Sequence, residues 1–180
     1  MHHGFALVET ALGRCSLAWS PAGIVAVGLP EASDAKTRAR ILDRLPDAVE
    51  ATPPPAPAAA AQGIVDLLRG QGGDLSGIVL DMTRVPPFHR RVYEAARRIP
   101  PGRTLTYGQL AARCDAPGAA RAVGGALQRN PFVLVVPCHR VVRAGGGMGG
   151  FSAHGGIETK ERLLAIEAAA AHDAPQGLGA

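Results

Sequence analysis

The sequence lacks the features that mark membrane proteins, secreted proteins and disulfide-rich scaffolds. No segment approaches the unbroken apolar length of a membrane span, although 47% of the 180 residues are hydrophobic. The N-terminal Met-His-His-Gly has neither the basic nor the apolar region of a secretory signal. The three cysteines, Cys15, Cys114 and Cys138, are odd in number and form no Cys-x-x-Cys pair. We therefore expect a cytoplasmic protein with reduced thiols and no membrane partner.

Residues 1–82 contain no cluster of His, Asp and Glu that suggests a catalytic site. Turn-forming residues separate three apolar stretches, a pattern typical of an antiparallel meander. We expect strands at 5–11, 14–19, 24–29 and 78–82. Helical spacing of apolar residues predicts helices at 34–45, capped by Ser33 or Asp34, and at 58–69. Four prolines within residues 52–57 predict a stiff, extended connector between these helices.

Positive charge is concentrated in one part of the chain. Residues 83–143 hold eleven arginines against two acidic residues, a local net charge of +9. The flanking segments 1–82 and 144–180 carry net charges of −3 and −2. A GC-rich genome also enriches arginine, but the acidic flanks come from the same genome. The middle segment therefore has the charge of a surface that meets a polyanion.

A candidate nucleophile follows a short apolar run. Residues 132–136 are all apolar and mostly β-branched, which predicts a buried strand that ends at Pro137. Cys138 comes next, and the cationic groups of His139 and Arg140 can lower the pKa of a neighbouring thiol. The same residues would also fit a structural cysteine beside an ordinary ion pair.

The segment between Pro86-Pro87 and this run is predicted to be helical. The first helix, 88–99, places Arg90, Arg91, Arg97 and Arg98 on one side, either as a solvated face or for phosphate contact. Helices at 107–113, capped by Thr106, and at 119–129 flank a short turn, which is the helix-turn-helix pattern. The last helix contains Gly124-Gly125, at a cost of about 1 kcal/mol each relative to alanine. Close approach to a nucleic-acid groove, or tight core packing, would compensate for this cost.

Four motifs together resemble one protein family. They are PGRTLTYGQLA from residue 101, ARAVGGALQRNP from residue 120, VPCHRVV from residue 136, and GGFSAHGG with KERLLAIE between residues 149 and 167. In order and spacing these motifs resemble the O6-alkylguanine-DNA alkyltransferases, also called methylated-DNA–protein-cysteine methyltransferases. The resemblance covers about half of the chain.

The resemblance implies an α/β (α+β) fold in two parts. Residues 1–82 are expected to form a ribonuclease-H-like antiparallel sheet with helices that supports the rest. Residues 83–170 would form a helical domain for DNA binding and alkyl transfer, with a winged-helix-like helix-turn-helix. We expect residues 171–180 to be a disordered tail.

The family's reaction implies roles for particular residues. Cys138 would accept the alkyl group, with a water between it and the base His139, and Glu167 would orient the histidine. A Cys-His-Glu set could equally serve a cysteine hydrolase. Tyr107 would crowd the 3′ phosphate and donate a proton to the base, while Asn130 would hydrogen-bond the active-site loop. Further residues are implied in DNA binding (Arg121, Ala120, Gly124 and Gly125) and in the substrate pocket (Val141, Met148, Phe151 and Ser152).

The expected function is the irreversible, single-turnover repair of O6-alkylguanine, with O4-methylthymine as a further substrate. A flipped-out base in the minor groove of duplex DNA is implied, with Arg121 filling the gap, because a stacked base is out of reach of a thiol. We expect a monomer that uses no metal or organic cofactor. A non-catalytic lesion sensor and a transcriptional regulator are alternatives. The sequence departs from the commonest family pattern at Phe151, where tyrosine is usual, and in a loop 152–156 that is one residue longer.

Overall fold

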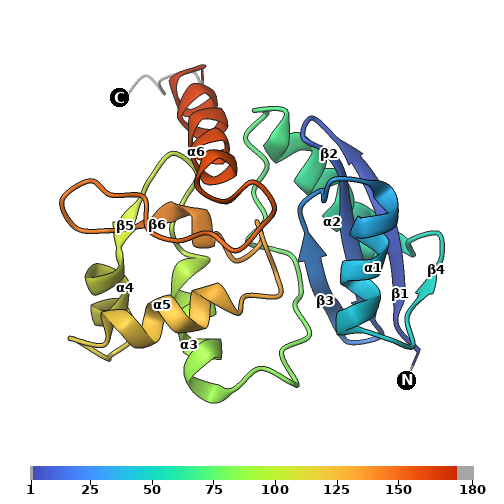
Figure 1. Cartoon of the computed structure of the whole chain (residues 1–180), viewed down its shortest axis with the longest axis horizontal. Coiled ribbons are helices and arrows are strands. Elements are labelled where there is room, and N and C mark those ends of the chain that lie inside the picture. Colours follow the sequence, from blue (N-terminus) through green and yellow to red (C-terminus); the bar gives the residue numbers. More distant parts are fainter. Residues whose placement is uncertain (1, 174–180) are drawn as a thin grey trace, which may run out of the picture.

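The computed structural model describes residues 2–173, which form two lobes side by side (Figure 1). A four-stranded sheet with two helices makes up one lobe, and the other is mainly helical. An extended stretch after α2 connects the lobes and leads into α3. The mixed α/β fold agrees with the expectation from the sequence.

The sheet has the strand order β3-β2-β1-β4. Its first three strands are β1 (Gly4–Thr10), β2 (Gly13–Ser20) and β3 (Gly23–Gly28), which pair antiparallel as a meander. This confirms the three predicted strands. The short β4 (Val49–Glu50) pairs parallel with β1 and was not predicted.

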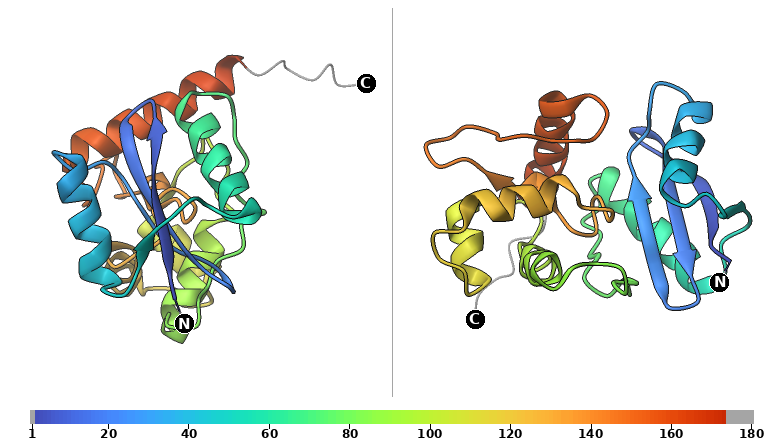
Figure 2. Two further views of the ribbon diagram at one scale, coloured as in Figure 1. Left: turned by 90° about the vertical axis from the view of Figure 1, so that its right-hand side faces the viewer. Right: turned by 60° about the horizontal axis from the view of Figure 1, so that its bottom comes forward.

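The two helices of this lobe cover opposite faces of the sheet (Figure 2). Helix α1 (Asp34–Arg44) begins at Ser33, whose side chain accepts a hydrogen bond from the Lys36 amide at 3.2 Å, as predicted for an N-cap. Ile41 and Leu45 pack with Phe5 on that face. Helix α2 (Pro55–Leu68) packs its apolar side against the other face.

Two predictions in this lobe were wrong. The connector predicted at 52–57 is short, because α2 begins at Pro55, three residues earlier than expected. Prolines are tolerated in the first helical turn, where the amide has no partner within the helix. Residues 78–82 form no regular strand. They make a single parallel bridge between Leu80 and Ile24. The Ile24 amide donates to the Val79 carbonyl, and the Ile24 carbonyl accepts from the Asp81 amide.

Within residues 2–173, the second lobe contains four α-helices. Helix α3 (Pro87–Ala96) buries Val92, Ala95 and Ala96. Helix α4 (Tyr107–Arg113) begins with a reciprocal cap between Thr106 and Gln109, and packs against α5 (Ala120–Gln128) across a short turn. The strands β5 (Leu105–Thr106) and β6 (Val141–Val142) have two residues each and pair parallel.

The last helix, α6 (Gly156–Asp173), packs against residues 138–140. It includes residues 171–173, so the predicted disordered tail was wrong for these three residues. The remainder of that prediction, 174–180, lies outside the described residues. Among residues 2–173, no helix has both the length and the apolar character needed to cross a membrane.

The predicted strand at 132–136 is instead an irregular turn. Phe132, Leu134 and Val136 are buried, as expected, but only isolated bridges form. Leu134 has a φ of 74°, in the left-handed region that interrupts a strand. The apolar run correctly indicated burial, but it did not indicate the local backbone conformation.

Candidate functional site

Cys138 lies in the wall of a cavity of about 560 Å³. It is the first residue of a short 3₁₀ helix, η1 (Cys138–Arg140), and its side chain is half-buried. Helices α4 and α5 and the loop before α6 supply the other walls. The lining residues are Tyr107, Ala120, Arg121, Gly124, Leu127, Gln128, Cys138, Arg143, Gly149, Gly150, Phe151 and Ser152.

Asn130 holds the turn that presents Cys138. Its side-chain amide donates to the carbonyl of Val136 at 2.9 Å, and its side-chain oxygen accepts from the amide of Phe132 at 2.8 Å. The Cys138 amide donates to the same Val136 carbonyl at 2.8 Å. These buried bonds replace the strand pairing that the turn lacks, and they fix the backbone leading to the sulfur.

A buried cluster stands behind Cys138. His139 Nε2 lies 2.7 Å from Glu167 Oε1. Arg140 donates to both oxygens of Glu167, at 2.9 and 2.7 Å, and to the carbonyl of Ile99 at 2.6 Å. Burial alone would raise the pKa of Glu167, but the hydrogen bonds from His139 and Arg140 lower it to about 2. Glu167 is therefore a carboxylate at neutral pH.

This cluster fixes the tautomer of His139. An ionised carboxylate only accepts hydrogen bonds, so Nε2 must carry the proton and Nδ1 keeps a lone pair. Nδ1 is buried and has no hydrogen-bond partner within residues 2–173. Burial lowers the pKa of His139 below its ordinary value and outweighs the hydrogen bond and charge of Glu167, which would raise it, while the charges of Arg140 and Lys160 lower it further. The imidazole is therefore a neutral base at physiological pH.

The expected lowering of the Cys138 pKa was wrong in direction. Burial raises the pKa of this thiol, and the opposing effects of the Asn130 side chain, the Lys160 charge and nearby amides are smaller. His139 gives no positive charge to offset burial because it is neutral, and Arg140 is engaged by Glu167. The resting side chain is a thiol that needs a base when it reacts.

Lys160 is a candidate functional residue that the sequence analysis missed. It is fully buried, and its ammonium donates to the carbonyl of Val141 at 2.6 Å and to that of Gly150 at 3.4 Å. It also lies 5.9 Å from the centroid of the Tyr107 ring. Burial lowers the pKa of Lys160, and the nearby Cys138 opposes this. The available signal was its spacing from Leu163 and Glu167, which puts a lysine on the buried face of α6.

Tyr107 is fixed against the loop before α6. Gly149 has a φ of 75°, and a Cβ at this position would lie 2.5 Å from the Tyr107 hydroxyl oxygen. Glycine is therefore required for both its backbone conformation and its lack of a side chain. Burial raises the pKa of Tyr107, so its hydroxyl keeps its proton at neutral pH.

Not every residue predicted for the site lines the cavity. Val141, Met148 and Gly125 are absent from its walls, and the Val141 carbonyl already accepts from Lys160. Cys138, Tyr107, Arg121, Ala120, Gly124, Phe151 and Ser152 are brought together there. His139, Asn130 and Glu167 lie behind the cavity, in the hydrogen-bonded layer that supports Cys138. Arg143 lines the cavity and was not predicted.

Two of the four arginines on the helix predicted at 88–99, which were expected either on a solvated face or in contact with phosphate, donate to backbone carbonyls. Arg97 donates to the carbonyls of Leu75, Ser76 and Ile78, at 3.2, 3.0 and 2.7 Å. Arg90 donates to the carbonyl of Met82 at 2.7 Å. Both side chains therefore tie α3 to the stretch that joins the lobes.

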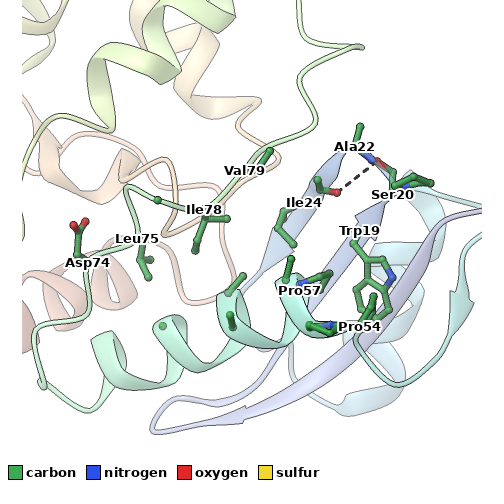
Figure 3. Close-up of a pocket in the computed structure, with 18 of the residues that line it drawn as sticks. Trp19, Ser20, Ala22, Ile24, Pro54, Pro57, Asp74, Leu75, Ile78 and Val79 are labelled. Carbon is green, nitrogen blue, oxygen red and sulfur yellow. Dashed lines mark hydrogen bonds between the residues drawn. The ribbon is translucent and has the colours of Figure 1, made fainter.

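A larger cavity, of about 980 Å³, lies in the other lobe (Figure 3). Trp19, Pro57 and Ile78 are among its mainly apolar walls, and only His2 and Asp74 of its lining residues are titratable. It contains no cysteine. The candidate nucleophile Cys138 lies in the wall of the smaller cavity.

Comparison with known proteins identifies the class to which this arrangement belongs. Residues 87–169 match the family described as 6-O-methylguanine DNA methyltransferase, DNA binding domain. The methylated-DNA–protein-cysteine methyltransferase of Mycobacterium bovis is 41% identical over 136 residues, covering 73% of this chain and 79% of the relative. That of Methanothermobacter thermautotrophicus is 42% identical over 118 residues, covering 66% and 65%. A third, from Mycolicibacterium paratuberculosis, is 50% identical over 90 residues, covering 50% and 53%.

Solved structures match over nearly the whole chain. Mycobacterium tuberculosis OGT in complex with DNA has a TM-score of 0.74 at 30% identity, covering 93% of this chain and 94% of that chain. An O6-methylguanine-DNA methyltransferase from Pyrococcus kodakaraensis has a TM-score of 0.67 at 28% identity, covering 91% and 98%. The chain belongs to the methylated-DNA–protein-cysteine methyltransferase family. Its sequence alignments span about half to two thirds of two of these relatives' own lengths.

Proposed function

We propose that this protein repairs O6-alkylguanine in duplex DNA by moving the alkyl group onto Cys138 in a single irreversible turnover. O4-methylthymine is proposed as a further substrate. The observation that carries the proposal is the cavity in which Cys138, Tyr107 and Arg121 meet. The family membership, and a similar structure described as a complex with DNA, add support.

The proposed reaction is an in-line displacement at the alkyl carbon. The proton of Cys138 leaves toward Nδ1 of His139, directly or through one water, while Glu167 holds the Nε2–H. The Sγ–C bond forms as the C–O6 bond breaks, and Tyr107 donates a proton to the leaving guanine. The proton taken up by His139 then replaces the one lost by Tyr107 through solvent, so in net terms the thiol proton ends on the guanine and Cys138 becomes a neutral thioether. A thioether has no easy hydrolytic exit, so the protein is consumed.

The proposed DNA surface is the outer side of α4 and α5, acting as a helix-turn-helix in the minor groove. Arg121 is exposed and borders the reactive cavity, so it can occupy the gap that a flipped nucleotide leaves. A Cβ at Gly124 would make only ordinary contacts with Tyr107 at 3.8 Å, and one at Gly125 would meet nothing within 4 Å. Packing within the protein therefore does not require these glycines. An external surface that approaches the helix closely would require them.

Mass spectrometry tests the transfer directly. After incubation with duplex DNA containing O6-methylguanine, the protein should gain one methylene, and peptide masses should place it on Cys138. Cys138→Ser should gain none. Cys114→Ser, which alters a buried cysteine outside the cavity, should still be methylated. An unmodified wild-type protein that binds the lesion selectively would be a sensor, and one that binds a single undamaged sequence would be a regulator. Either result would overturn the proposal.

The remaining parts of the proposal are a monomeric state and a cytoplasmic location. Sedimentation of the free protein at micromolar concentration tests the first. Imaging of a tagged protein in the cells that make it tests the second. A stable dimer or a different compartment would correct these parts without affecting the alkyl transfer.

A further inference from the structure

One wall of the reactive cavity is shared with a second, smaller cavity between the two lobes. This interlobe cavity has a volume of about 100 Å³ and is bounded by β3, α1 and the loop before α6. Ser152 and Gln128 line both cavities. The Ser152 hydroxyl donates to the carbonyl of Gln128 at 3.3 Å. A shift of Ser152 would therefore change the shape of the cavity around Cys138.

The lobe that contains the four-stranded sheet, called the first lobe below, contacts this wall through Arg40 on α1. One guanidinium nitrogen of Arg40 donates to the backbone carbonyl of Ser152 at 3.4 Å. A second guanidinium nitrogen lies 3.0 Å from Oε1 of Glu31, and this ion pair anchors the arginine. The Glu31 amide in turn donates to the Thr37 hydroxyl at 3.0 Å, which fixes Glu31 to the first turns of α1.

A second contact joins the same carboxylate to the loop. His154 Nδ1 lies 3.5 Å from Oε2 of Glu31. The Glu31 side chain is only 14% exposed, whereas Arg40 and His154 are 56% and 53% exposed. Glu31 is therefore the buried centre of the contact, with one group from its own lobe and one from the loop on either side. Arg44 also lines the interlobe cavity and keeps the surroundings cationic.

The loop has little regular structure of its own to hold it. Residues 143–155 contain no helix or strand, and Gly149 and Gly155 have φ values of 75° and 84°. Four residues of this segment, 152–155, belong to the 152–156 stretch that the sequence predicts to be one residue longer than usual. Its position therefore depends on tertiary contacts. Lys160 and Thr159 of α6 donate to the carbonyls of Gly150 and His154, and Ser152 and His154 make the contacts with the first lobe.

We infer that Glu31 and Arg40 are positioning residues, through which the first lobe sets the shape of the alkyl-accepting cavity by holding Ser152 and His154. This inference rests on the proposed function and extends it to the first lobe. Exposed ion pairs are weak, so the expected effects are about three- to fivefold rather than complete losses. A wall that moves should affect a bulky alkyl group more than a methyl group, because the bulky group fills more of the cavity.

Amide hydrogen exchange tests the contact without requiring any repair activity. In Arg40→Ala and Glu31→Gln, exchange over residues 151–156 should be about three- to fivefold faster than in the wild type. The matched control is Arg38→Ala, because Arg38 is on the same helix but pairs with Glu50 within the first lobe. The control should leave exchange in the loop unchanged, and Arg40→Lys should partly restore protection. Equal exchange in Arg40→Ala and Arg38→Ala would overturn the inference.

Transfer rates test the consequence for the reaction. The ratio of the rate with O6-benzylguanine to that with O6-methylguanine, both in duplex DNA, should change about threefold in Arg40→Ala and Glu31→Gln. A general loss of stability would lower both rates together, so it would leave the ratio unchanged. An unchanged ratio would refute the positioning role. If the wild type transfers neither group, the proposed function fails, while the exchange result still decides whether the contact holds the loop.

Discussion

Replacing Gly125 by alanine should stabilise the protein and impair its action on duplex DNA. Gly125 lies in the interior of α5, where alanine is favoured over glycine by about 1 kcal/mol. A Cβ there would meet no atom within 4 Å, so no steric cost offsets this gain. For a chain of this size, 1 kcal/mol corresponds to a rise of roughly 2–4 °C in Tm.

The same methyl group should weaken the binding of DNA. If the minor-groove surface packs directly on Gly125, an added methyl group would cost about 1–3 kcal/mol, since it overfills a close contact. The affinity for duplex DNA should therefore fall about tenfold, which corresponds to 1.4 kcal/mol. Free O6-benzylguanine needs no groove, so its rate of transfer to Cys138 should not change.

Three measurements on Gly125→Ala test the expected gain in stability and the expected loss of DNA affinity. Calorimetry gives the change in Tm, a fluorescence titration gives the affinity for lesion-containing duplex, and peptide mass gives the rate with the free base. Higher stability with unchanged DNA affinity would refute a groove contact at Gly125. A lower Tm would refute the reasoning about its open surroundings.

Further predictions concern the residues of the site and of the layer behind it. Arg121→Ala should slow repair of duplex DNA about tenfold or more but leave transfer from free O6-benzylguanine nearly unchanged, and equal losses in the two rate assays would refute the base-flipping role. Burial lowers the pKa of His139 below 6.5, so the unfolded chain binds the extra proton as pH falls below that value. The pKa of Glu167 is lowered from 4.5 to about 2, which removes further stability as pH falls from 4.5 toward 2. Tm should therefore decrease steadily below pH 6.5, and a Tm that rises between pH 6.5 and 5 would contradict this. Lys160→Met should raise the pKa of Cys138 further, seen as a shift to higher pH in the rate of its alkylation by iodoacetamide.

The elements that the sequence predicted well are those specified by local signals. Ser33 or Asp34 before an apolar-periodic stretch located α1, and Thr106 located the start of α4. Glycine at the turns separated the first three strands in the correct places. These features depend on residues within a few positions of one another, so a single sequence contains all the information needed.

The elements that it predicted wrongly depend on distant contacts. Residues 132–136 have the composition of a buried strand, but β3 pairs with them only at Val27, which bridges Phe132 and accepts a hydrogen bond from the Val133 amide. The side chain of Asn130 takes over their hydrogen bonds and permits the left-handed Leu134. Strand β4 has two exposed residues, Val49 and Glu50, and exists only because β1 presents a free edge there.

The candidate site was predicted as a set of residue types, but its electrostatics were not. The neighbours of Cys138 suggested a lowered thiol pKa, because His139 and Arg140 carry or can carry positive charge. The fold buries His139, which keeps the imidazole neutral, and places Glu167, 28 residues after the histidine in sequence, where it pairs with Arg140. The contact of Arg40 with Ser152 spans 112 residues, and nothing in either local sequence indicates it.

A protected thiol suits the proposed single-turnover reaction. Each molecule of a single-turnover protein is lost if its sulfur reacts with anything other than the lesion. Because burial raises the pKa of Cys138, only a small fraction is thiolate at neutral pH, and reaction with other electrophiles or oxidants is slow. In the proposed reaction, the neutral His139, held as the Nε2–H tautomer by Glu167, accepts the thiol proton as the sulfur attacks a positioned carbon atom. A thiol that stays protonated at rest is more selective than a permanent thiolate would be. The rate of the proposed transfer must then come from the positions of the base and of the cavity walls.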